Sequence, residues 1–356
     1  PLPRRGYTGS DGVMRIAIVN DLALARAVLR KVVQSVPAYS VAWEAVDGAD
    51  AVTKAAADRP DVILMDLMMP VMDGAEATRQ IMRRSPCPIL IVTASLGVNH
   101  GKVYEALGAG GLDAVRTPTF GACGEVLGAE PLLKRLARQN LSKANFTPAG
   151  GVLVLPPPGK STVSPAGFPL LAIGASTGGP DAVSRVLAAI GPCPPAAVVV
   201  VQHIGGDFTA GLADWLRDKT GLSVKVASRG ERPIAGRVYV AGGDEHLILD
   251  PDRRFAYTPE PAAAVFRPNI DVFFESAAAN WPDGGVGVLL TGMLRDGARG
   301  LLTLRTRGWH TVAQDEATCV VYGMPKAAAE LKAATEILPL DAIGPAARAK
   351  LAAKAK

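Results

Sequence analysis

Short apolar runs alternate with amphipathic stretches through the first third of the chain, and this alternation predicts a first α/β domain. Each run of four or five aliphatic residues suits a strand buried on both faces, and each stretch between runs has the spacing of a helix with one apolar face. Five such repeats imply an open parallel sheet with helices on both faces. The predicted strands are 16–19, 41–45, 62–65, 89–92 and 112–115, and the predicted helices are 22–34, 48–58, 74–84 and 99–108.

The same alternation returns after residue 168, so the chain is predicted to form two domains. A helical pattern over 131–141 completes the first domain, which we place at 14–140. Residues 141–168 are rich in proline and glycine, which is typical of a linker. We interpret 1–13 as a tag or non-native extension and 346–356 as a basic tail. The second domain, 169–345, has predicted strands at 170–173, 197–201, 224–227, 238–241 and 286–290.

Composition narrows the class of protein. A chain of 356 residues is long enough for two cores. No apolar run reaches the length of a membrane span and no export signal is present, so we expect a cytoplasmic protein without direct membrane insertion. The 4 cysteines are far apart, which disfavours a zinc site or a disulfide framework. The net charge of +5 is not gathered in a basic helix with aromatic residues, so we expect no nucleic-acid partner.

Polar residues follow three predicted strands of the first domain. Asn20 and Asp21 follow the first strand, Asp66 follows the third and Thr93 follows the fourth. Because the carboxyl ends of parallel strands share one sheet edge, these side chains form an oxygen-rich pocket suited to Mg²⁺ and to a phosphoryl group on one carboxylate. Helix caps and turns would explain each residue alone, but they do not explain the shared placement.

A glycine-rich turn opens the second domain and presents Ser176. Apolar residues precede the turn and Pro180 suits the first turn of a helix after it, so the serine lies between a buried strand and a helix N-terminus. The spacing fits G-x-S-x-G, in which a serine nucleophile stands on a sharp turn. A phosphate-binding turn, or a solvated serine in an ordinary connection, fits this stretch equally well until catalytic partners are found.

Two further strands of the second domain end in residues that could activate this serine. His203 follows one strand and Asp296 follows another, which brings both to the edge where Ser176 lies. A serine nucleophile needs a base, and the base needs an orienting group. The chain order Ser, His, Asp differs from that of α/β-hydrolases, so we reject that family. His246 and His310 are the competing bases, and we interpret both as structural or rim residues.

Six motifs of the second domain occur in an order that resembles the chemotaxis protein-glutamate methylesterase family. Preceded by the phosphoacceptor run around Asp66, the whole chain resembles the response-regulator methylesterase. Its first strand and the segment 112–118 are closest to the Wsp-type surface-sensing branch. The resemblance implies a flavodoxin-like receiver and a Rossmann-like esterase domain. The motifs are Gly174–Gly179, Gln202-His203, Val240–Leu247, Arg267-Pro268 with Asp271–Phe273, Thr291–Met293 with Asp296-Gly297, and Gln314–Glu316 with Val321–Pro325.

The receiver resemblance implies a role for each residue of the first pocket. Asp66 would be the phosphoacceptor, and Mg²⁺ would be held by Asp21, Asp66 and the backbone carbonyl of Met68. Thr93 would bond a phosphoryl oxygen. Asn20 stands where receivers usually have a second acid, so we expect weaker Mg²⁺ binding. A second departure is Thr117, which occupies the usual place of a lysine.

The esterase resemblance implies hydrolysis of glutamyl γ-methyl esters, and often glutamine deamidation, on the cytoplasmic helices of a methyl-accepting chemoreceptor. Ser176 would form an acyl-enzyme, His203 would move the proton and Asp296 would orient the histidine. The backbone N–H groups of Thr177 and Met293 would hold the oxyanion. No cofactor is implied for this reaction.

The combination of domains implies regulation by a histidine kinase of the chemosensory array, with the receiver as an autoinhibitory lid. We expect a monomer. Leu294 stands where the family usually has glycine, which leaves open a phosphorylation-controlled adaptor with weak or no esterase activity. A nucleotide-binding regulator is a further alternative, but no acid closes the strand after the glycine-rich turn.

Overall fold

The computed structural model describes residues 13–94, 100–143, 167–262, 264 and 266–354. Its contacts divide the chain into two compact units, 1–96 with 114–146 and 97–113 with 147–356. Helix α4 (His100–Gly108) is thereby grouped with the second unit. Residues 1–12 of the predicted extension (1–13) lie outside the described residues. So do residues 144–166 of the predicted linker (141–168).

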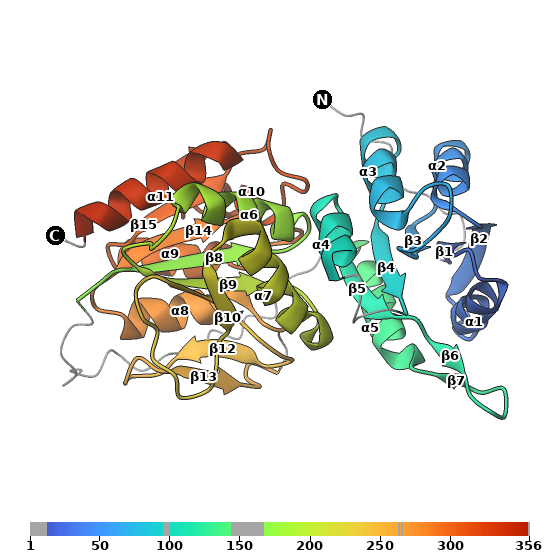
Figure 1. Ribbon diagram of the computed structural model, residues 1–356, viewed down its shortest axis with the longest axis horizontal. Coiled ribbons are helices and arrows are strands. Elements are labelled where there is room, and N and C mark those ends of the chain that lie inside the picture. Colours follow the sequence, from blue (N-terminus) through green and yellow to red (C-terminus); the bar gives the residue numbers. More distant parts are fainter. Residues whose placement is uncertain (1–12, 95–99, 144–166, 263, 265, 355–356) are drawn as a thin grey trace. The chain divides into compact units, whose positions relative to one another are not determined.

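The first unit contains a five-stranded sheet in the order β2-β1-β3-β4-β5, which is the flavodoxin-like order (Figure 1). The pairs β1–β2, β1–β3 and β3–β4 are parallel, as expected. The predicted boundaries agree within about two residues. The elements are β1 (Met14–Val19), α1 (Ala23–Gln34), β2 (Tyr39–Ala45), α2 (Gly48–Ala57), β3 (Val62–Met65), α3 (Gly74–Arg84), β4 (Ile89–Thr93), β5 (Asp113–Arg116) and α5 (Ala129–Lys143).

Two acidic caps start the helices that flank β3. Asp47 accepts a hydrogen bond from Asp50 N before α2, and Asp73 accepts one from Glu76 N before α3. A hairpin that the hydrophobic pattern does not predict, β6 (Thr119–Phe120) with β7 (Val126–Leu127), precedes α5. It is too short to show an alternating pattern.

The second unit contains a seven-stranded sheet in the order β10-β11-β9-β8-β14-β15-β16, in which every neighbouring pair is parallel. Helices α6, α7 and α11 pack together on one face, and α8, α9 and α10 on the other (Figure 1). The strands are β8 (Leu170–Ala175), β9 (Ala197–Gln202), β10 (Ser223–Val226), β11 (Arg237–Val240), β14 (Gly285–Leu289), β15 (His310–Gln314) and β16 (Glu336–Leu338). The helices are α6 (Gly179–Ile190), α7 (Gly206–Thr220), α8 (Ile270–Asn280), α9 (Ala298–Thr306), α10 (Met324–Glu330) and α11 (Leu340–Lys354).

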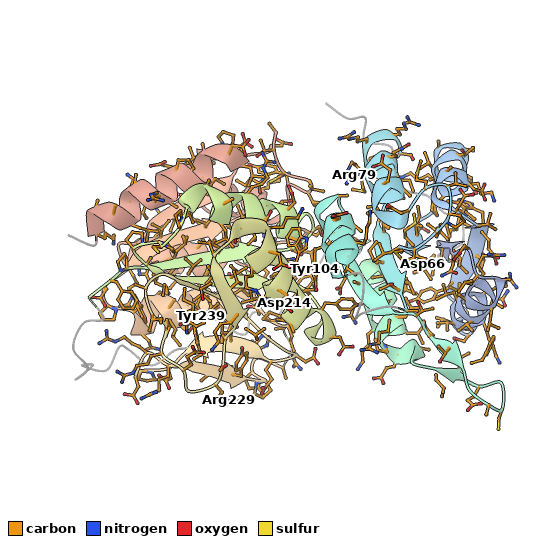
Figure 2. The ribbon with its side chains drawn as sticks, viewed as in Figure 1. Asp66, Arg79, Tyr104, Asp214, Arg229 and Tyr239 are labelled. Carbon is orange, nitrogen blue, oxygen red and sulfur yellow. The ribbon has the colours of Figure 1, made fainter. Side chains whose placement is uncertain are left out.

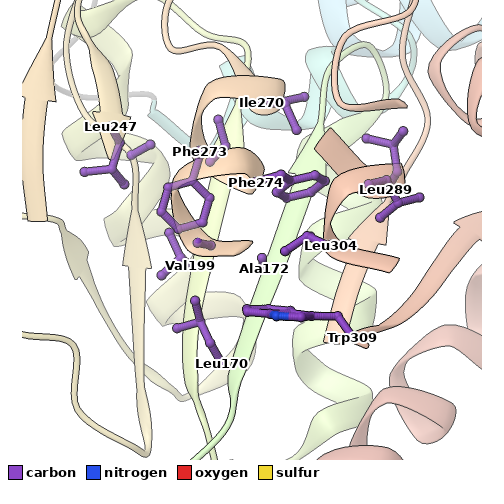
Figure 3. Packing of buried hydrophobic residues seen from close by; sticks show 14 of the residues in the cluster. Leu170, Ala172, Val199, Leu247, Ile270, Phe273, Phe274, Leu289, Leu304 and Trp309 are labelled. Atoms are coloured by element: carbon purple, nitrogen blue, oxygen red, sulfur yellow. The ribbon is translucent and has the colours of Figure 1, made fainter. Parts of the chain in front are cut away.

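The core of this unit is mainly aliphatic and lies between the sheet and α8 and α9. Strands β8 and β9 are buried along their whole length, as their continuous apolar runs predict. Figure 3 shows Phe273 and Phe274 of α8 and Leu304 of α9 packed over the sheet, with Trp309 below them. A separate antiparallel pair, β12 (His246–Leu249) with β13 (Phe255–Thr258), also contributes to this core.

The prediction of a basic tail at 346–356 is wrong for its described part. Residues 346–354 continue α11, and the helix packs against α6 and β14. Ile343, Ala347 and Leu351 recur every fourth residue and are fully buried, so they form one apolar face. Arg348 and Lys350 lie between these residues and conceal the pattern when charge alone is read. None of the described helices has both the length and the apolar character needed to cross a membrane.

The packing of α11 predicts a clear stability difference between two neighbouring substitutions. Leu351→Ala removes a fully buried side chain and should lower the free energy of unfolding by about 2 to 4 kcal/mol. Lys350→Ala removes only a half-exposed ion pair with Glu336 and should change the free energy of unfolding by less than about 0.5 kcal/mol. Urea unfolding of both variants measures the difference, and equal midpoints would contradict the packed helix.

Candidate active site

Ser176 lies at the carboxyl end of β8, where the strand passes through a tight turn into α6. The serine is largely buried, and its backbone carbonyl accepts hydrogen bonds from Gly179 N and from the side-chain amide of Gln202. Strands β9 and β14 flank β8, so the serine stands where the strand order reverses. In open parallel sheets this switch point is the usual position of a binding site.

His203 and Asp296 come from the connections that follow the two flanking strands, as the sequence predicts. His203 Nε2 and Asp296 Oδ2 lie 2.7 Å apart, and both side chains are less than one-tenth exposed. His203 N donates to Ala175 O, which fixes the histidine beside the serine turn. Because the carboxylate can only accept, the Nε2 nitrogen carries the proton. The buried Nδ1 has no hydrogen-bond partner among the described residues and is left as the basic nitrogen.

The Asp296 carboxylate is held by backbone N–H groups as well as by the histidine. Ile270 N and Asp271 N, at the start of α8, donate to its two oxygens at 2.8 and 3.1 Å, and Gly297 N donates at 2.9 Å. Desolvation pushes the pKa of Asp296 upward, but the His203 hydrogen bond and these N–H groups outweigh it and hold the pKa below its usual value. Asp296 is therefore an anion beside the histidine.

The aromatic ring of Phe266 is a component of this site that the sequence analysis misses. It stacks on the His203 imidazole with ring centroids 4.2 Å apart and planes 9° apart. The stacked ring covers one face of the imidazole and restricts its rotation. The only signal in the sequence is that Phe266 directly precedes the Arg267-Pro268 motif, and nothing in that spacing indicates contact with a histidine 63 positions earlier.

The structure places Thr177 and Met293 on the two loops beside Ser176. Within the described residues neither backbone N–H has an acceptor, so both are available to an anion. Leu294, which follows Met293, has φ 63°, in the left-handed region where a leucine costs about 1 to 2 kcal/mol relative to an ordinary conformation. A glycine would adopt this conformation without that cost.

Thr291 ties three segments of the site together. Its hydroxyl donates to Thr177 O at 2.9 Å and accepts from Val321 N at 3.0 Å. Its backbone N–H donates to the Gln314 side chain at the end of β15. The next residue, Gly292, passes so close to the serine that a methyl group there would lie 2.7 Å from Ser176 Cβ. Only glycine fits this approach.

The two remaining histidines of the second domain are engaged elsewhere, in line with their interpretation as structural residues. His246 is fully buried, and its Nδ1 accepts from Asn269 N at 3.1 Å, just before α8. His310 starts β15, and its Nε2 lies 3.3 Å from Glu336 of β16.

The first unit brings Asn20, Asp21 and Asp66 together at the carboxyl edge of its sheet. Asp66, labelled in Figure 2, follows β3 and accepts hydrogen bonds from Leu67 N at 2.7 Å and from the Asn20 amide at 2.9 Å. Desolvation and then the charge of Asp21 raise the pKa of Asp66 to about 6. The pocket therefore holds two carboxylates, Asp21 and Asp66, that repel each other, and the Asn20 amide is hydrogen-bonded to Asp66.

Other predicted residues of this pocket also lie at the same edge. Thr93 ends β4 and is buried, and its carbonyl accepts from Thr117 N at 3.1 Å. The Thr117 hydroxyl is buried and has no hydrogen-bond partner in the described part of the chain. Met68 follows Asp66 by two residues on the connection to α3, with a half-exposed side chain.

Comparison with known proteins gives the same division of the chain. The family model "CheB methylesterase" matches residues 171–347, and "Response regulator receiver domain" matches 16–118. A protein-glutamate methylesterase/protein-glutamine glutaminase of Cupriavidus pinatubonensis is 50% identical over 93% of this chain and 96% of its own length. One from Pseudomonas aeruginosa is 48% identical over 93% and 98%.

Solved structures of the separate domains are more distant. The CheB methylesterase catalytic domain of Thermotoga maritima is 34% identical, covers 52% of this chain and 99% of its own, and has a TM-score of 0.48. The matches define a response-regulator hydrolase with a receiver and an esterase domain. This chain belongs to the CheB methylesterase family.

The close approach of Gly292 predicts that a single added methyl group disturbs the site. In Gly292→Ala the new Cβ would meet Met324 Sδ at 2.3 Å and Ser176 Cβ at 2.7 Å, so we expect at least about a tenfold loss of kcat. Gly308→Ala is the control, since its φ of 80° strains an alanine but nothing lies within 4 Å. It should lower Tm while kcat stays at the parent value. Hydrolysis of an activated ester measures kcat, and an unchanged Gly292→Ala rate would contradict the described approach.

Proposed function

We propose that this chain hydrolyses γ-methyl esters of glutamate on the cytoplasmic helices of a methyl-accepting chemoreceptor, using Ser176, His203 and Asp296. The observation that supports it most directly is the buried His203–Asp296 pair, which leaves one basic nitrogen free at the sheet edge that carries the serine. The match to receiver-linked methylesterases over 93% of the chain supports the substrate class.

The reaction follows from the hydrogen-bonding capacity of these groups. Ser176 Oγ attacks the ester carbonyl carbon as its proton passes to His203 Nδ1, and the Asp296 carboxylate stabilises the resulting imidazolium. The N–H groups of Thr177 and Met293 hold the oxyanion. Collapse of this intermediate breaks the C–O bond, and the imidazolium gives its proton to the departing methoxide, which leaves as methanol.

Water then completes the cycle. It attacks the acyl-enzyme carbonyl and gives a proton to His203, and collapse returns that proton to Ser176 Oγ while the glutamate carboxyl group leaves. The same steps convert a glutamine side chain into glutamate with ammonia as the leaving group. The names of the relatives include this second activity, and we propose it for this chain on that basis.

Replacing the nucleophile tests the proposed chemistry directly. Ser176→Ala should lower methanol release from a methylated receptor by at least about 10³-fold, because no acyl-enzyme can form. Ser184→Ala, on the outer face of α6, is the matched control and should release methanol at the parent rate. Gas chromatography of the released methanol provides the measurement. If Ser176→Ala kept a measurable parent rate, a group other than Ser176 would be the nucleophile; if the parent itself released no methanol, the chain would be a phosphorylation-controlled adaptor instead.

The first unit supplies a site for regulation. We propose that a histidine kinase of the chemosensory array phosphorylates Asp66, with Mg²⁺ held by Asp21, Asp66 and the Met68 carbonyl. The donor set fits a hard cation, because Asp21 repels Asp66 and a divalent ion would relieve that repulsion. Among the described residues no group of three His, Cys, Asp or Glu side chains is arranged to hold a metal ion, and at this edge Asn20 supplies an amide in place of a third acid. Thr93 would bond a phosphoryl oxygen.

The departures in this pocket support the finer assignment to the Wsp-type branch. Asn20 directly follows the first strand and donates a hydrogen bond to Asp66. Thr117 places a buried hydroxyl in the position of the usual lysine. We propose that phosphorylation here releases the esterase from inhibition by the receiver, and that the protein acts as a monomer.

Phosphorylation should raise methanol release only when Asp66 and Mg²⁺ are both present. With acetyl phosphate and Mg²⁺ we expect a rise of about tenfold, which corresponds to a coupling of about 1.4 kcal/mol. Asp66→Asn or EDTA should prevent the rise. Asn20→Asp adds an anionic ligand, so half-maximal activation should need less Mg²⁺. Equal activation of Asp66→Asn and the parent would exclude this site.

A further inference from the structure

The starts of helices α8 and α9 are joined by hydrogen bonds behind the His203–Asp296 pair, because a carboxylate near each start accepts from N–H groups of the other helix. Asp296, just before α9, accepts from the first N–H groups of α8, as described above. In return, the side chain of Asp271 in the first turn of α8 accepts from Gly300 N in the first turn of α9, with 2.6 Å between the atoms. First-turn N–H groups have no partner in their own helix, so each carboxylate satisfies the other helix. The two N-termini are tied reciprocally.

The helices cross at closest approach at the same point. A methyl group on Gly300 would lie 2.7 Å from Phe274 Cβ and 2.9 Å from Asp271 Cα. Figure 3 shows Phe274 and Leu304, from the two helices, packed in the core beside this crossing. Packed interiors resist deformation, so a shift of Asp271 is passed to Asp296 through the backbone of the helix starts.

Three carboxyl groups gather here with one cation. The Arg299 guanidinium lies 3.7 Å from Asp271 Oδ2, and its Nε donates to Glu275 Oε1 at 3.1 Å. Desolvation and then the charge of Asp296 raise the pKa of Asp271 to about 7, and desolvation also raises the pKa of Glu275. Arg299 favours the charged form of both acids and so balances the negative charge beside Asp296.

We propose that Asp271 and Arg299 are positioning residues of the His203–Asp296 pair, with Asp271 fixing the Asp296 carboxylate through α9 and Arg299 balancing the surrounding charge. The inference rests on the proposed role of the triad. Both residues act through Asp296 and not on the substrate. A structural role alone would change stability, whereas this role also changes the charge that the imidazolium experiences during the reaction.

The direction of each effect follows from charge. Three groups interact electrostatically with Asp296, namely Asp271 and Glu275 on α8 and His246 on β12. Arg299 on α9 pairs with the two acids, and Arg267 lies beyond His246. An anion stabilises the imidazolium and a cation destabilises it. Removing the Asp271 charge should therefore move the acid limb of kcat/KM to lower pH, but only slightly, because a pKa of about 7 leaves this carboxyl partly ionised in that range. Removing the Arg299 charge should move it to higher pH.

The experiment compares Asp271→Asn, Arg299→Met and the double variant in the full-length protein, with methylated receptor as substrate. Asparagine keeps an acceptor for Gly300 N, and Arg299 is half-exposed, so both variants retain the fold, which thermal unfolding verifies. We expect opposite shifts of the acid limb, roughly half a pH unit in Arg299→Met and a smaller one in Asp271→Asn, with the double variant between the two. Arg299→Met also removes the cation that pairs with Asp271, which loosens the carboxylate that fixes Asp296 through α9, so we expect kcat to fall about tenfold with KM within about twofold. Arg299→Lys should recover most of kcat.

The control is Arg307→Met, an exposed arginine at the other end of α9, which should match the parent in rate and pH profile. Unshifted acid limbs in Asp271→Asn and Arg299→Met, or shifts in the same direction, would overturn the proposal. The Ser176→Ala variant distinguishes failure of the positioning role from failure of the proposed function. If it is inactive while the acid limbs stay fixed, the proposed function stands and the positioning role fails. If it is active, the proposed function itself fails.

Discussion

The second unit depends on the burial of one negative charge. A carboxylate removed from water is costly unless charged and hydrogen-bonded partners surround it. Asp296 meets this requirement with His203 and three backbone N–H groups, two of them at the start of α8. The helix that covers the core is therefore also the electrostatic support of the histidine. Loss of any one of these donors would leave a buried acceptor less satisfied, so the fold and the site share one constraint.

Much of this arrangement is predictable from residue order because parallel strands impose it. Continuous apolar runs locate strands β8 and β9, and polar residues directly after a parallel strand must lie at its carboxyl edge. That rule places Ser176, His203 and Asp296 at one edge of the sheet without any knowledge of loop conformation. Asp66 and Thr93 follow the same rule in the first unit. The fold class is confirmed by the two family matches.

The features that the sequence does not predict depend on loop paths and on exact approach distances. Phe266 reaches His203 through a connection with no periodic pattern, and the tie from Thr291 to Thr177 spans 114 positions. The exchange between Asp271 and Gly300 requires the crossing of two helices, which local propensity does not fix. The wrong prediction of a basic tail at 346–356 has another cause. The apolar residues of α11 form a narrow face that is recognised only at helical spacing, and the basic residues among them suggest an exposed segment.

The tie made by Thr291 has a kinetic consequence. It joins residues 114 positions apart, and the pair of His203 and Asp296 spans 93. Contacts of such long sequence separation form late, since closing a long loop costs entropy before the contact stabilises anything. Ser176 therefore gains its surroundings only after the central strands have assembled. Modification of this proposed nucleophile by an electrophile would report completion of the sheet, not the formation of local turns.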